Sequence, residues 1–411
     1  MSTDDQPRTL KAMLSEAKDT SELMVDLAYA ALFFGDSRMA NEVQALEERL
    51  EDLAHKMREV CVLAARSPRD AEEMSSVLHV LSAIERLGNA GVEIAHIVTH
   101  NLGIPAGLVA DLAAAEEISH RVRVREGSAL AQRSLADVAL PTEVGMRVVA
   151  IRRGDEWIFD PDGNDMVLAG DVLILRGPAE GIGELRELAG APEWRPPGTD
   201  EDPAVITDLD RAVDVLVEMK NVSEVAIGLA YSALLFNDQS LAAEVNHLED
   251  RLDEMRERLE VWVLRSAAEQ VEPSPLRGLL HLGNAAEELG DAAQQMVWLV
   301  EEAEEMHPIL AIALGDSDEV IARIPVSEGS FLDGKKLSEA QLELETGFYL
   351  LAIRRAGRYL YRPRGPVRLQ AGDELIASGP DEGRERLAEL GGFRVLEDDT
   401  TGEIALLPVD S

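Results

Sequence analysis

The sequence repeats itself once at a fixed offset of 202 residues, and this duplication limits the possible folds more than any other feature. The stretch AIRRGDEWIFDP begins at Ala150, and AIRRAGRYLYRP begins at Ala352. At the same offset, Lys18–Asp52 and Lys220–Glu254 share 17 identities in 35 positions. A period this long is not that of a solenoid repeat. Each copy is long enough to form its own core, so the 411 residues should fold as two equivalent halves.

The first part of each copy has the hydrophobic period of an α-helix. In the first copy, apolar residues recur at alternating spacings of three and four over residues 13–34, 39–64 and 70–99. The connections between these segments are short, which favours antiparallel packing of neighbouring helices. The pattern therefore predicts an antiparallel three-helix bundle in each copy.

The second part of each copy has short apolar runs that are typical of β-strands. In the first copy the segments RVRVREGS, RVVAIRR, EWIFDP and DVLILRG are bounded by turn residues, and GIGELRELAG has the pattern of a closing helix. The order is βαβββα in about 70 residues. We therefore predict an α+β multidomain protein, with two copies of a three-helix bundle followed by a small βαβββα domain.

These patterns predict six segments. Helical bundles are expected over 8–112 and 205–313, α+β domains over 117–190 and 318–393, a linker over 191–204 and an acidic tail over 394–411. The linker is rich in proline, glycine and acidic residues and continues neither pattern. We expect the tail to add at most one strand.

The chain is strongly acidic but has the composition of a folded protein. Acidic residues outnumber basic ones 78 to 39, while 46% of residues are hydrophobic. Lysine is rare and aromatic residues make up only 4%, which is typical of proteins from salt-accumulating halophiles. Molar salt shortens the Debye length to about 3 Å and would screen the self-repulsion. Clustered basic residues are missing, so nucleic acid and anionic lipid are excluded as partners.

Other features indicate a cytoplasmic protein. Cys61 is the only cysteine and its counterpart is Val263, so we expect a buried thiol and no intrachain disulfide. The first residues, MSTDDQPRTL, do not resemble a secretion signal, and no uncharged apolar run approaches 18 residues. We expect no membrane insertion.

The α+β segments resemble the C-terminal domain of TrkA-type regulators, the ligand-sensing part of subunits that gate potassium channels and transporters. The resemblance rests on an EGS turn, the AIRR strand, a proline after the next strand, and AGD before an apolar strand followed by GP, all present twice. The Gly-x-Gly-x-x-Gly nucleotide motif is missing, so we do not expect nicotinamide dinucleotide binding.

The helical segments resemble the PhoU family, whose third helix bears a Glu-Arg-Ile-Gly-Asp motif. ERLGNA at Glu85–Ala90 and EELGDA at Glu287–Ala292 occupy that place. The resemblance implies a three-helix bundle in each copy, with metal bound through Glu/Asp-x-x-x-Asp pairs. Such a spacing places two carboxylates on one helix face.

The TrkA resemblance also implies a ligand site across a pair of α+β domains, where several family members bind cyclic di-AMP. Apolar strand residues would stack the bases, and cations or backbone amides would meet the phosphates. The candidate residues are Val149, Ile151, Arg153, Pro161, Leu351, Ile353, Arg355 and Pro363. The alternative is that AIRR is an ordinary strand with an outward arginine pair.

This chain departs from the ligand-binding family members at one position. Those members carry a basic residue shortly before the AIRR strand, whereas this chain has Pro141 and Glu343 there. Arg147 in the first copy, or Arg362 with Arg364 in the second, would compensate for the missing charge.

Metal ligands are only half retained. Glu22 and Asp26 have Glu224 and Gly228 as counterparts, and Glu287 and Asp291 have Glu85 and Asn89. We therefore predict a solvated acidic face and no metal site, with these four carboxylates as the weak candidates. Glu93, His96 and His100 share a helix face but are replaced in the second copy by Gln295, Trp298 and Glu302.

No nucleophile, Walker lysine or repeated Cys-His pair is present, so we expect no enzyme and no firm cofactor. A fused duplicate would build within one chain the two-fold arrangement that two subunits usually make. We therefore predict an intramolecular pseudo-dimer, with a homodimer as a further state to test.

The leading hypothesis is a cytoplasmic regulator of membrane cation transport, with potassium ahead of magnesium, that acts at the inner face of the membrane through a separate channel or transporter. The competing hypothesis is a PhoU-like phosphate-signalling or metal-binding protein in which the α+β domains only hold the dimer together. A purely structural adaptor is the third.

Overall fold

The computed structural model describes residues 9–105, 108, 112, 115–194, 207–269, 274–302, 306–397 and 404–409. The chain divides into two compact units, and each unit contains segments from both copies of the repeat. A helical unit comprises Met1–Ala115 and Pro196–Ser317, and an α+β unit comprises Glu116–Arg195 and Asp318–Ser411. The helical segments of the two copies therefore pack together in one unit, and the α+β segments pack together in the other.

The first copy contributes three long helices to the helical unit: α1 (Leu10–Phe34), α2 (Ser37–Ala64) and α3 (Pro68–Thr99). Their ends follow from local chemistry, because Thr9, Asp36 and Ser67 each accept a backbone N–H bond at a helix N-terminus. All three predicted helices are confirmed. Residues at the predicted spacing, such as Val43, Leu50 and Met57, are buried between the helices.

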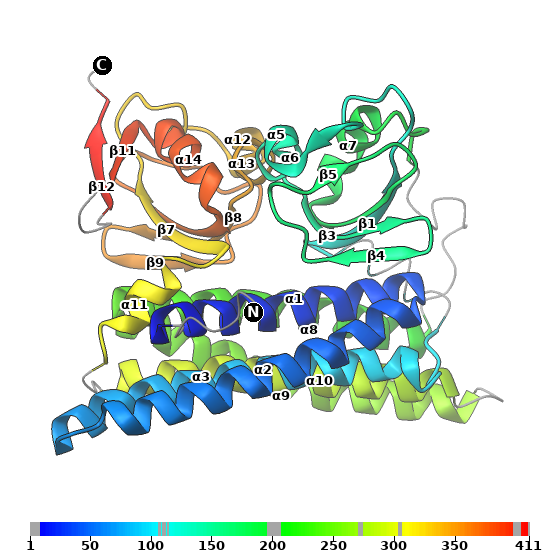
Figure 1. Cartoon of the computed structure of the whole chain (residues 1–411), viewed down its shortest axis with the longest axis horizontal. Coiled ribbons are helices and arrows are strands. Elements are labelled where there is room, and N and C mark those ends of the chain that lie inside the picture. Colours follow the sequence, from blue (N-terminus) through cyan, green and yellow to red (C-terminus); the bar gives the residue numbers. More distant parts are fainter. Residues whose placement is uncertain are drawn as a thin grey trace, which may run out of the picture. The chain divides into compact units, whose positions relative to one another are not determined.

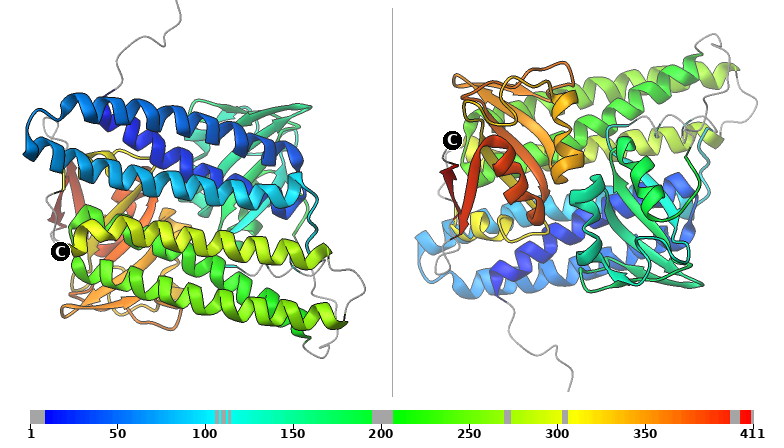
Figure 2. Two further views of the ribbon diagram at one scale, coloured as in Figure 1. Left: turned by 90° about the horizontal axis from the view of Figure 1, so that it is seen from below. Right: turned by 90° about the horizontal axis from the view of Figure 1, so that it is seen from above.

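The second copy repeats this bundle with α8 (Asp208–Phe236), α9 (Gln239–Glu269) and α10 (Ser274–Glu301), followed by the short α11 (Ile309–Leu314). Thr207 and Asp210 form a reciprocal capping box at the start of α8. The two bundles meet where α3 packs along α10, and α11 packs on α1 (Figure 2). The helical unit is thus one continuous core shared by both copies.

Reciprocal side-chain contacts join the bundles. The Lys18 ammonium lies 5.1 Å from the centre of the Tyr231 ring, and its counterpart Lys220 lies 5.2 Å from the Tyr29 ring. Each ammonium also donates to the glutamate four residues ahead, at 2.7 Å. Each copy contributes the same lysine and the same tyrosine position to the other, which is the pattern of an isologous interface.

The first α+β domain is built on an antiparallel sheet in the order β1-β6-β3-β4, of which Figure 1 labels β1, β3 and β4. Its strands are β1 (Ile118–Arg123), β3 (Arg147–Arg153), β4 (Glu156–Phe159) and β6 (Val172–Gly177), and a two-residue pair joins β2 (Arg133–Ser134) to β5 (Met166–Val167). The helical elements are α5 (Leu135–Val138), α6 (Leu140–Val144), η1 (Ala179–Gly181) and α7 (Ile182–Leu188).

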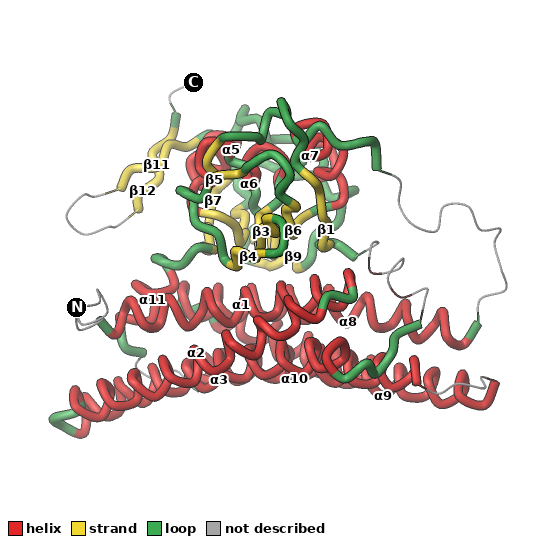
Figure 3. Tube along the Cα trace, turned by 45° about the vertical axis from the view of Figure 1, so that its right-hand side comes forward, coloured by secondary structure: helices red, strands yellow, loops and turns green. Residues whose placement is uncertain are grey.

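The second α+β domain repeats this topology in the order β7-β10-β8-β9. Its elements are β7 (Glu319–Pro325), α12 (Leu337–Ala340), α13 (Leu342–Thr346), β8 (Tyr349–Arg355), β9 (Arg358–Tyr361), β10 (Glu374–Pro380), η2 (Asp381–Gly383) and α14 (Arg384–Gly391). The predicted fold class is confirmed, since long helices and small antiparallel sheets alternate twice along the chain. Figure 3 shows the helices in red and the strands in yellow.

The C-terminal segment differs from the expected acidic tail. Two strands, β11 (Phe393–Glu397) and β12 (Ile404–Pro408), pair with each other as an antiparallel hairpin. Phe393, Val395 and Leu406 pack against the core of the second α+β domain. Phe393 and Val395 are two residues apart on β11 and Leu406 is paired with Val395, so the three side chains share one face of the hairpin. The expected linker lies mostly outside the described residues.

Among the described residues, no helix is both long and apolar enough to cross a membrane.

Candidate functional site

The two α+β domains meet along a seam that is formed by α6 of the first domain and α13 of the second. A β-carbon on Gly145 would lie 2.8 Å from the carbonyl oxygen of Glu343, and one on Gly347 would lie 2.7 Å from the carbonyl oxygen of Pro141. These contacts are reciprocal, because the two glycines are counterparts and so are Pro141 and Glu343. Both glycines also have positive φ angles, of 68° and 73°, so this approach requires glycine.

Ion pairs between the two α+β domains lie at one end of the seam. The Arg147 guanidinium donates to the Asp318 carboxylate at 3.0 Å and lies 3.5 Å from a Glu319 carboxylate oxygen. Arg147 belongs to the first domain and both carboxylates belong to the second. The arginine that was expected to supply positive charge for a ligand is therefore engaged by two acidic side chains.

The other end of the seam uses the counterparts of these residues with different chemistry. Tyr349 stands where the first copy has Arg147, and its hydroxyl donates to Glu116, the counterpart of Asp318. Arg362 lies 3.5 Å from Glu116, and Arg364 also pairs with it. The two ends of the seam therefore share a backbone plan but differ in their charged groups.

The apolar candidates lie on β3 and β8, at the centre of each sheet. Val149, Ile151, Leu351 and Ile353 are all buried. Val149 and Leu351 are β-bulge residues, because the register with β6 and β10 skips them. Their carbonyl oxygens instead accept N–H bonds from Asp160 and Arg362. Bulges are frequent beside binding sites, so their duplication at the candidate strand favours a functional role for it.

The arginine candidates are held inside their own domains. The Arg153 guanidinium donates two bonds to Asp171, at 3.0 and 2.8 Å, and one to the carbonyl of Met166. Arg355 makes the same three bonds to Asp373 and to the carbonyl of Arg368. These bonds to carboxylate raise the pKa of both arginines. A ligand phosphate would have to compete with an almost fully buried aspartate.

Pro161 and Pro363 are partly buried and stand two residues after the ends of β4 and β9, respectively. Each follows a residue with a left-handed backbone, Asp160 at φ 47° and Arg362 at φ 43°. Ala139 and Gln341, which precede α6 and α13, share the same unusual conformation at φ 46°. Such conformations cost free energy, and two of them, at Ala139 and Gln341, stand directly before the seam helices α6 and α13.

Three of the four weak metal candidates, Glu22, Glu287 and Asp291, lie beside cations of the chain itself, and the fourth, Asp26, is buried in α1. Glu22 accepts a bond from Lys18. The Arg86 guanidinium from α3 donates to both Glu288 and Asp291 on α10, each at 2.7 Å. Burial, followed by the charge of Asp291, raises the pKa of the neighbouring Glu287 carboxyl.

The histidine candidate is also incomplete. Glu93 lies within ion-pair distance of His96, at 3.7 Å, and of His281 from α10, at 3.9 Å, while the His100 ring packs against His96. Within the described residues, no group of three potential ligands has the geometry to hold a metal ion.

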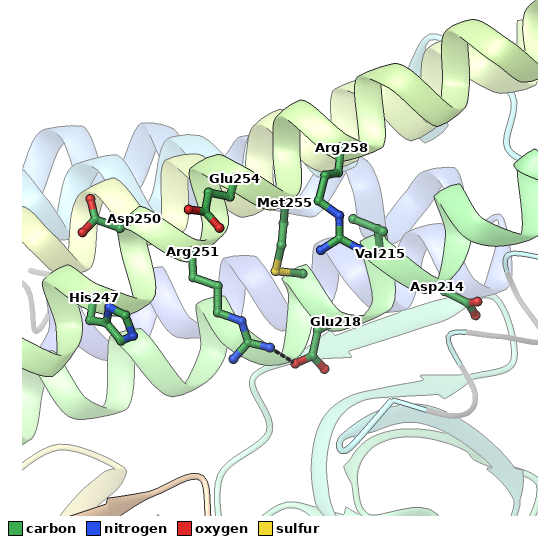
Figure 4. A pocket seen from close by; sticks show the side chains of 9 residues that line it. All are labelled: Asp214, Val215, Glu218, His247, Asp250, Arg251, Glu254, Met255 and Arg258. Atoms are coloured by element: carbon green, nitrogen blue, oxygen red, sulfur yellow. Dashed lines mark hydrogen bonds and ion pairs between the residues drawn. The ribbon is translucent and has the colours of Figure 1, made fainter.

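A surface groove of about 850 Å³ lies between α8 and α9 in the helical unit (Figure 4). Nine residues line it: Asp214, Val215, Glu218, His247, Asp250, Arg251, Glu254, Met255 and Arg258. Arg251 pairs with Glu218 at 2.8 Å, and Arg49 pairs with Glu16 in the same way in the first copy. The lining is mostly charged, unlike the apolar pockets that usually hold small ligands, so this groove is a poorer candidate than the seam.

Sequence reasoning missed the acidic residues of the seam, Glu116 and Glu117, and also Tyr349. Glu116 and Glu117 have the acids Asp318 and Glu319 as counterparts, so the signal that could have found them is a pair of adjacent acids retained before the first strand of each domain. Tyr349 replaces Arg147, so its signal is divergence: one copy has a base and the other a phenol at the contact between the copies.

Comparison with known families identifies both kinds of segment. A family model of the TrkA-C domain matches residues 120–190 and 321–391, and a family model of the PhoU domain matches residues 14–98 and 216–300. Both resemblances inferred from the sequence are thereby confirmed. No curated protein matches the chain.

Solved structures show only distant similarity. The crystal structure of PhoU from Pseudomonas aeruginosa is 14% identical, with a TM-score of 0.38 over 70% of this chain and 91% of that one. The GsuK channel bound to NAD is 14% identical, with a TM-score of 0.18 over 74% of this chain and 65% of that one. The GsuK RCK domain is 15% identical, with a TM-score of 0.17 and coverages of 67% and 63%.

Proposed function

Because this chain belongs to the proteins built from tandem PhoU and TrkA-C domains, we propose that it is a non-enzymatic regulator of membrane cation transport. Potassium is the leading candidate ion and magnesium the second. The protein would act from the cytoplasm on a separate channel or transporter, and it would respond to a small ligand at the seam between its α+β domains. Cyclic di-AMP is the first ligand to test.

The observation that carries this proposal is the duplicated architecture of the seam. Both domains place a β-bulge on the candidate strand, at Val149 and Leu351, and both place a left-handed residue before α6 or α13. The contact is reciprocal around Gly145 and Gly347. A ligand that changed this contact would change the relation between two halves of one chain, which is a direct route to signalling.

The charges of the seam set a condition on the ligand. A dianionic dinucleotide would need Arg147, Arg362 or Arg364 to leave its acidic partner. Binding would therefore include an exchange of ion pairs, which lowers the affinity but couples ligand binding to the interdomain contact.

Ion uptake in cells tests this function. Cells that lack the protein should show altered potassium uptake, and the wild-type gene should restore it. The Gly347→Ala variant, which disturbs the seam, should restore uptake poorly, whereas Gly357→Ala should restore it fully because that glycine has positive φ but open space around it. Unchanged uptake of both potassium and magnesium in the deletion would contradict the proposal.

The second candidate is a PhoU-like phosphate-signalling or metal-binding role, which is favoured by the PhoU match over both bundles. The α+β domains would then serve only to join the halves. Elemental analysis of the purified chain separates the two: iron, zinc or manganese at one equivalent or more per chain would favour this role. The Arg86 bonds to Glu288 and Asp291 lead us to expect no bound metal.

A further inference from the structure

The two ends of the seam carry different charges at equivalent positions. At one end, three side chains of the second α+β domain contact a single carboxylate of the first domain, that of Glu116. These side chains are Tyr349, Arg362 and Arg364. The counterparts of the four residues at the other end are Arg147, Asp160, Asp162 and Asp318. The first end combines two guanidinium groups with a phenol, whereas the second has one guanidinium group among three carboxylates. The donors that an anion needs are therefore gathered at the first end.

The fold of the second domain brings its three donors together. Tyr349 is the first residue of β8, and β9 pairs antiparallel with β8. The backbone N–H of Arg362 continues this pairing by donating to the carbonyl of the bulge residue Leu351, at 3.0 Å. The chain after β9 therefore runs toward the start of β8, and Arg362 and Arg364 contact the same carboxylate as Tyr349.

Burial distinguishes this cluster from a surface ion pair. The side chain of Arg362 is only 9% exposed, and its Nη2 lies 3.5 Å from Oε1 of Glu116. The Tyr349 hydroxyl donates to the other oxygen, Oε2. Burial, followed by the charge of Glu116, raises the pKa of the Tyr349 phenol, so its hydroxyl stays protonated and able to donate. Arg364 is 58% exposed, so the cluster is open to solvent on that side.

The chemistry of the three donors suits a phosphate group. Guanidinium groups bind phosphate oxygens through charge-assisted N–H···O bonds, and a phenol adds a further donor. In the structure both arginines contact the same oxygen, Oε1 of Glu116. A phosphate group presents negatively charged oxygens of the same kind, so it can replace this carboxylate as the acceptor.

We propose that the cluster is a phosphate-binding site at one end of the seam and that Glu116 is its built-in competitor. A phosphate group from solvent displaces the Glu116 carboxylate, accepts the bonds of the three donors, and so removes a contact between the two α+β domains. The end with Arg147 keeps its ion pairs and binds no phosphate. This inference rests on the proposed function, because it specifies which end of the seam holds the ligand and what the ligand displaces.

Calorimetric titration of the full-length chain with inorganic phosphate at a fixed KCl concentration tests the site. Glu116→Gln removes the competing charge with little change of shape, so its dissociation constant for phosphate should be about tenfold lower than that of the wild type. Glu117→Gln is the matched control, because Glu117 is the adjacent acid but pairs with Arg176 of its own domain. It should bind phosphate within about threefold of the wild type, and so should Asp318→Asn, which changes the other end.

Two further measurements cover a loss of stability in Glu116→Gln. Phosphate that binds the folded chain should raise the midpoint of thermal unfolding more in this variant than in the wild type. In the wild-type background, Arg364→Met should weaken phosphate binding about tenfold, because it removes a charged donor at an exposed position. Arg358→Met should not, since the exposed Arg358 lies at the β8–β9 turn, away from the start of β8.

Three results would overturn the proposal. They are no phosphate binding in any variant, equal affinity in the wild type and Glu116→Gln, and a gain in Asp318→Asn as large as in Glu116→Gln, which would come from net charge alone. Cyclic di-AMP is titrated separately into the same variants. The expected phosphate pattern without any heat from the dinucleotide would support the phosphate site and contradict dinucleotide sensing, so the two proposals fail in different ways.

Discussion

At the scale of single residues, Arg153 and Arg355 anchor the turn before the last strand of each sheet. Asp171 and Asp373, their partners, are each 1% exposed, and each also accepts a backbone N–H bond from the turn, from Leu168 or Gln370. The sequence showed that AIRR and AGD recur together but not that they bind each other. Spacing along the chain does not reveal a contact across a sheet.

Replacing Arg355 should therefore damage the fold before it damages a ligand site. We expect Arg355→Met to lower the free energy of unfolding by about 2 to 3 kcal/mol, because it leaves a buried carboxylate without its cation. Arg354→Met is the matched control: Arg354 pairs with Glu374 at an exposed site, so the loss should be below about 1 kcal/mol. Denaturant titration measures both, and equal losses would refute the buried clasp.

His120 should make the first α+β domain sensitive to acid. Burial, then the charges of Arg186 and Arg121, lowers its pKa to about 4. Because the pKa of His120 is lower in the folded state than in the unfolded state, the neutral imidazole stabilises the fold above pH 6.5. The free energy of unfolding should then fall by up to about 3 kcal/mol as pH drops toward about 4. His120→Ala, which places there the alanine of the second copy, should lose this pH dependence in thermal unfolding. An unchanged acid profile would contradict the assignment.

At the scale of elements, the helices were predictable and the seam was not. Long amphipathic periods identify α1, α2 and α3, because each turn adds another apolar residue to the same face. The seam depends on α6 and α13, which are five residues each and have no period to detect. The hairpin of β11 and β12 was underestimated for a related reason, since each strand has only five residues.

Two glycines with the same backbone conformation allow the seam contact to be measured. Gly145 and Gly154 have φ angles of 68° and 64°, but only Gly145 faces backbone of the other domain. Gly154→Ala should cost about 1 kcal/mol from conformation alone, while Gly145→Ala should cost about 3 kcal/mol because the methyl group also forces α13 away. Calorimetric unfolding gives both values. Similar costs would show that the close approach does not contribute.

At the scale of the whole molecule, the fixed offset predicted that two copies exist, and the structure shows how each unit uses them. Each unit contains segments of both copies. In the helical unit the two copies are joined by reciprocal pairs, such as Lys18 with Tyr231 and Lys220 with Tyr29. Arg86 and Glu288 occupy the same position in the two copies of the repeat, and their side chains form an ion pair with each other. Such contacts could not be predicted from one sequence, since they depend on how the bundles meet.

The net charge of −39 predicts that the fold depends on salt. Self-repulsion is strongest in dilute buffer, where the Debye length is about 30 Å at about 10 mM, and weak near 1 M, where it is about 3 Å. The midpoint of thermal unfolding should therefore rise by about 10 °C or more between these KCl concentrations. Sucrose, which strengthens burial without screening charge, should reproduce only a small part of the rise. A midpoint insensitive to KCl would refute the halophilic interpretation.

Ligand binding at the seam can be measured by calorimetric titration of the full-length chain with cyclic di-AMP in molar KCl. Because each chain carries its own pair of TrkA-C domains, we expect saturable binding of one ligand per chain, and a loss of affinity in Gly347→Ala that Gly357→Ala does not share. Absence of binding heat at every salt concentration and temperature, or binding that Gly347→Ala leaves unchanged, would contradict a ligand-sensing seam.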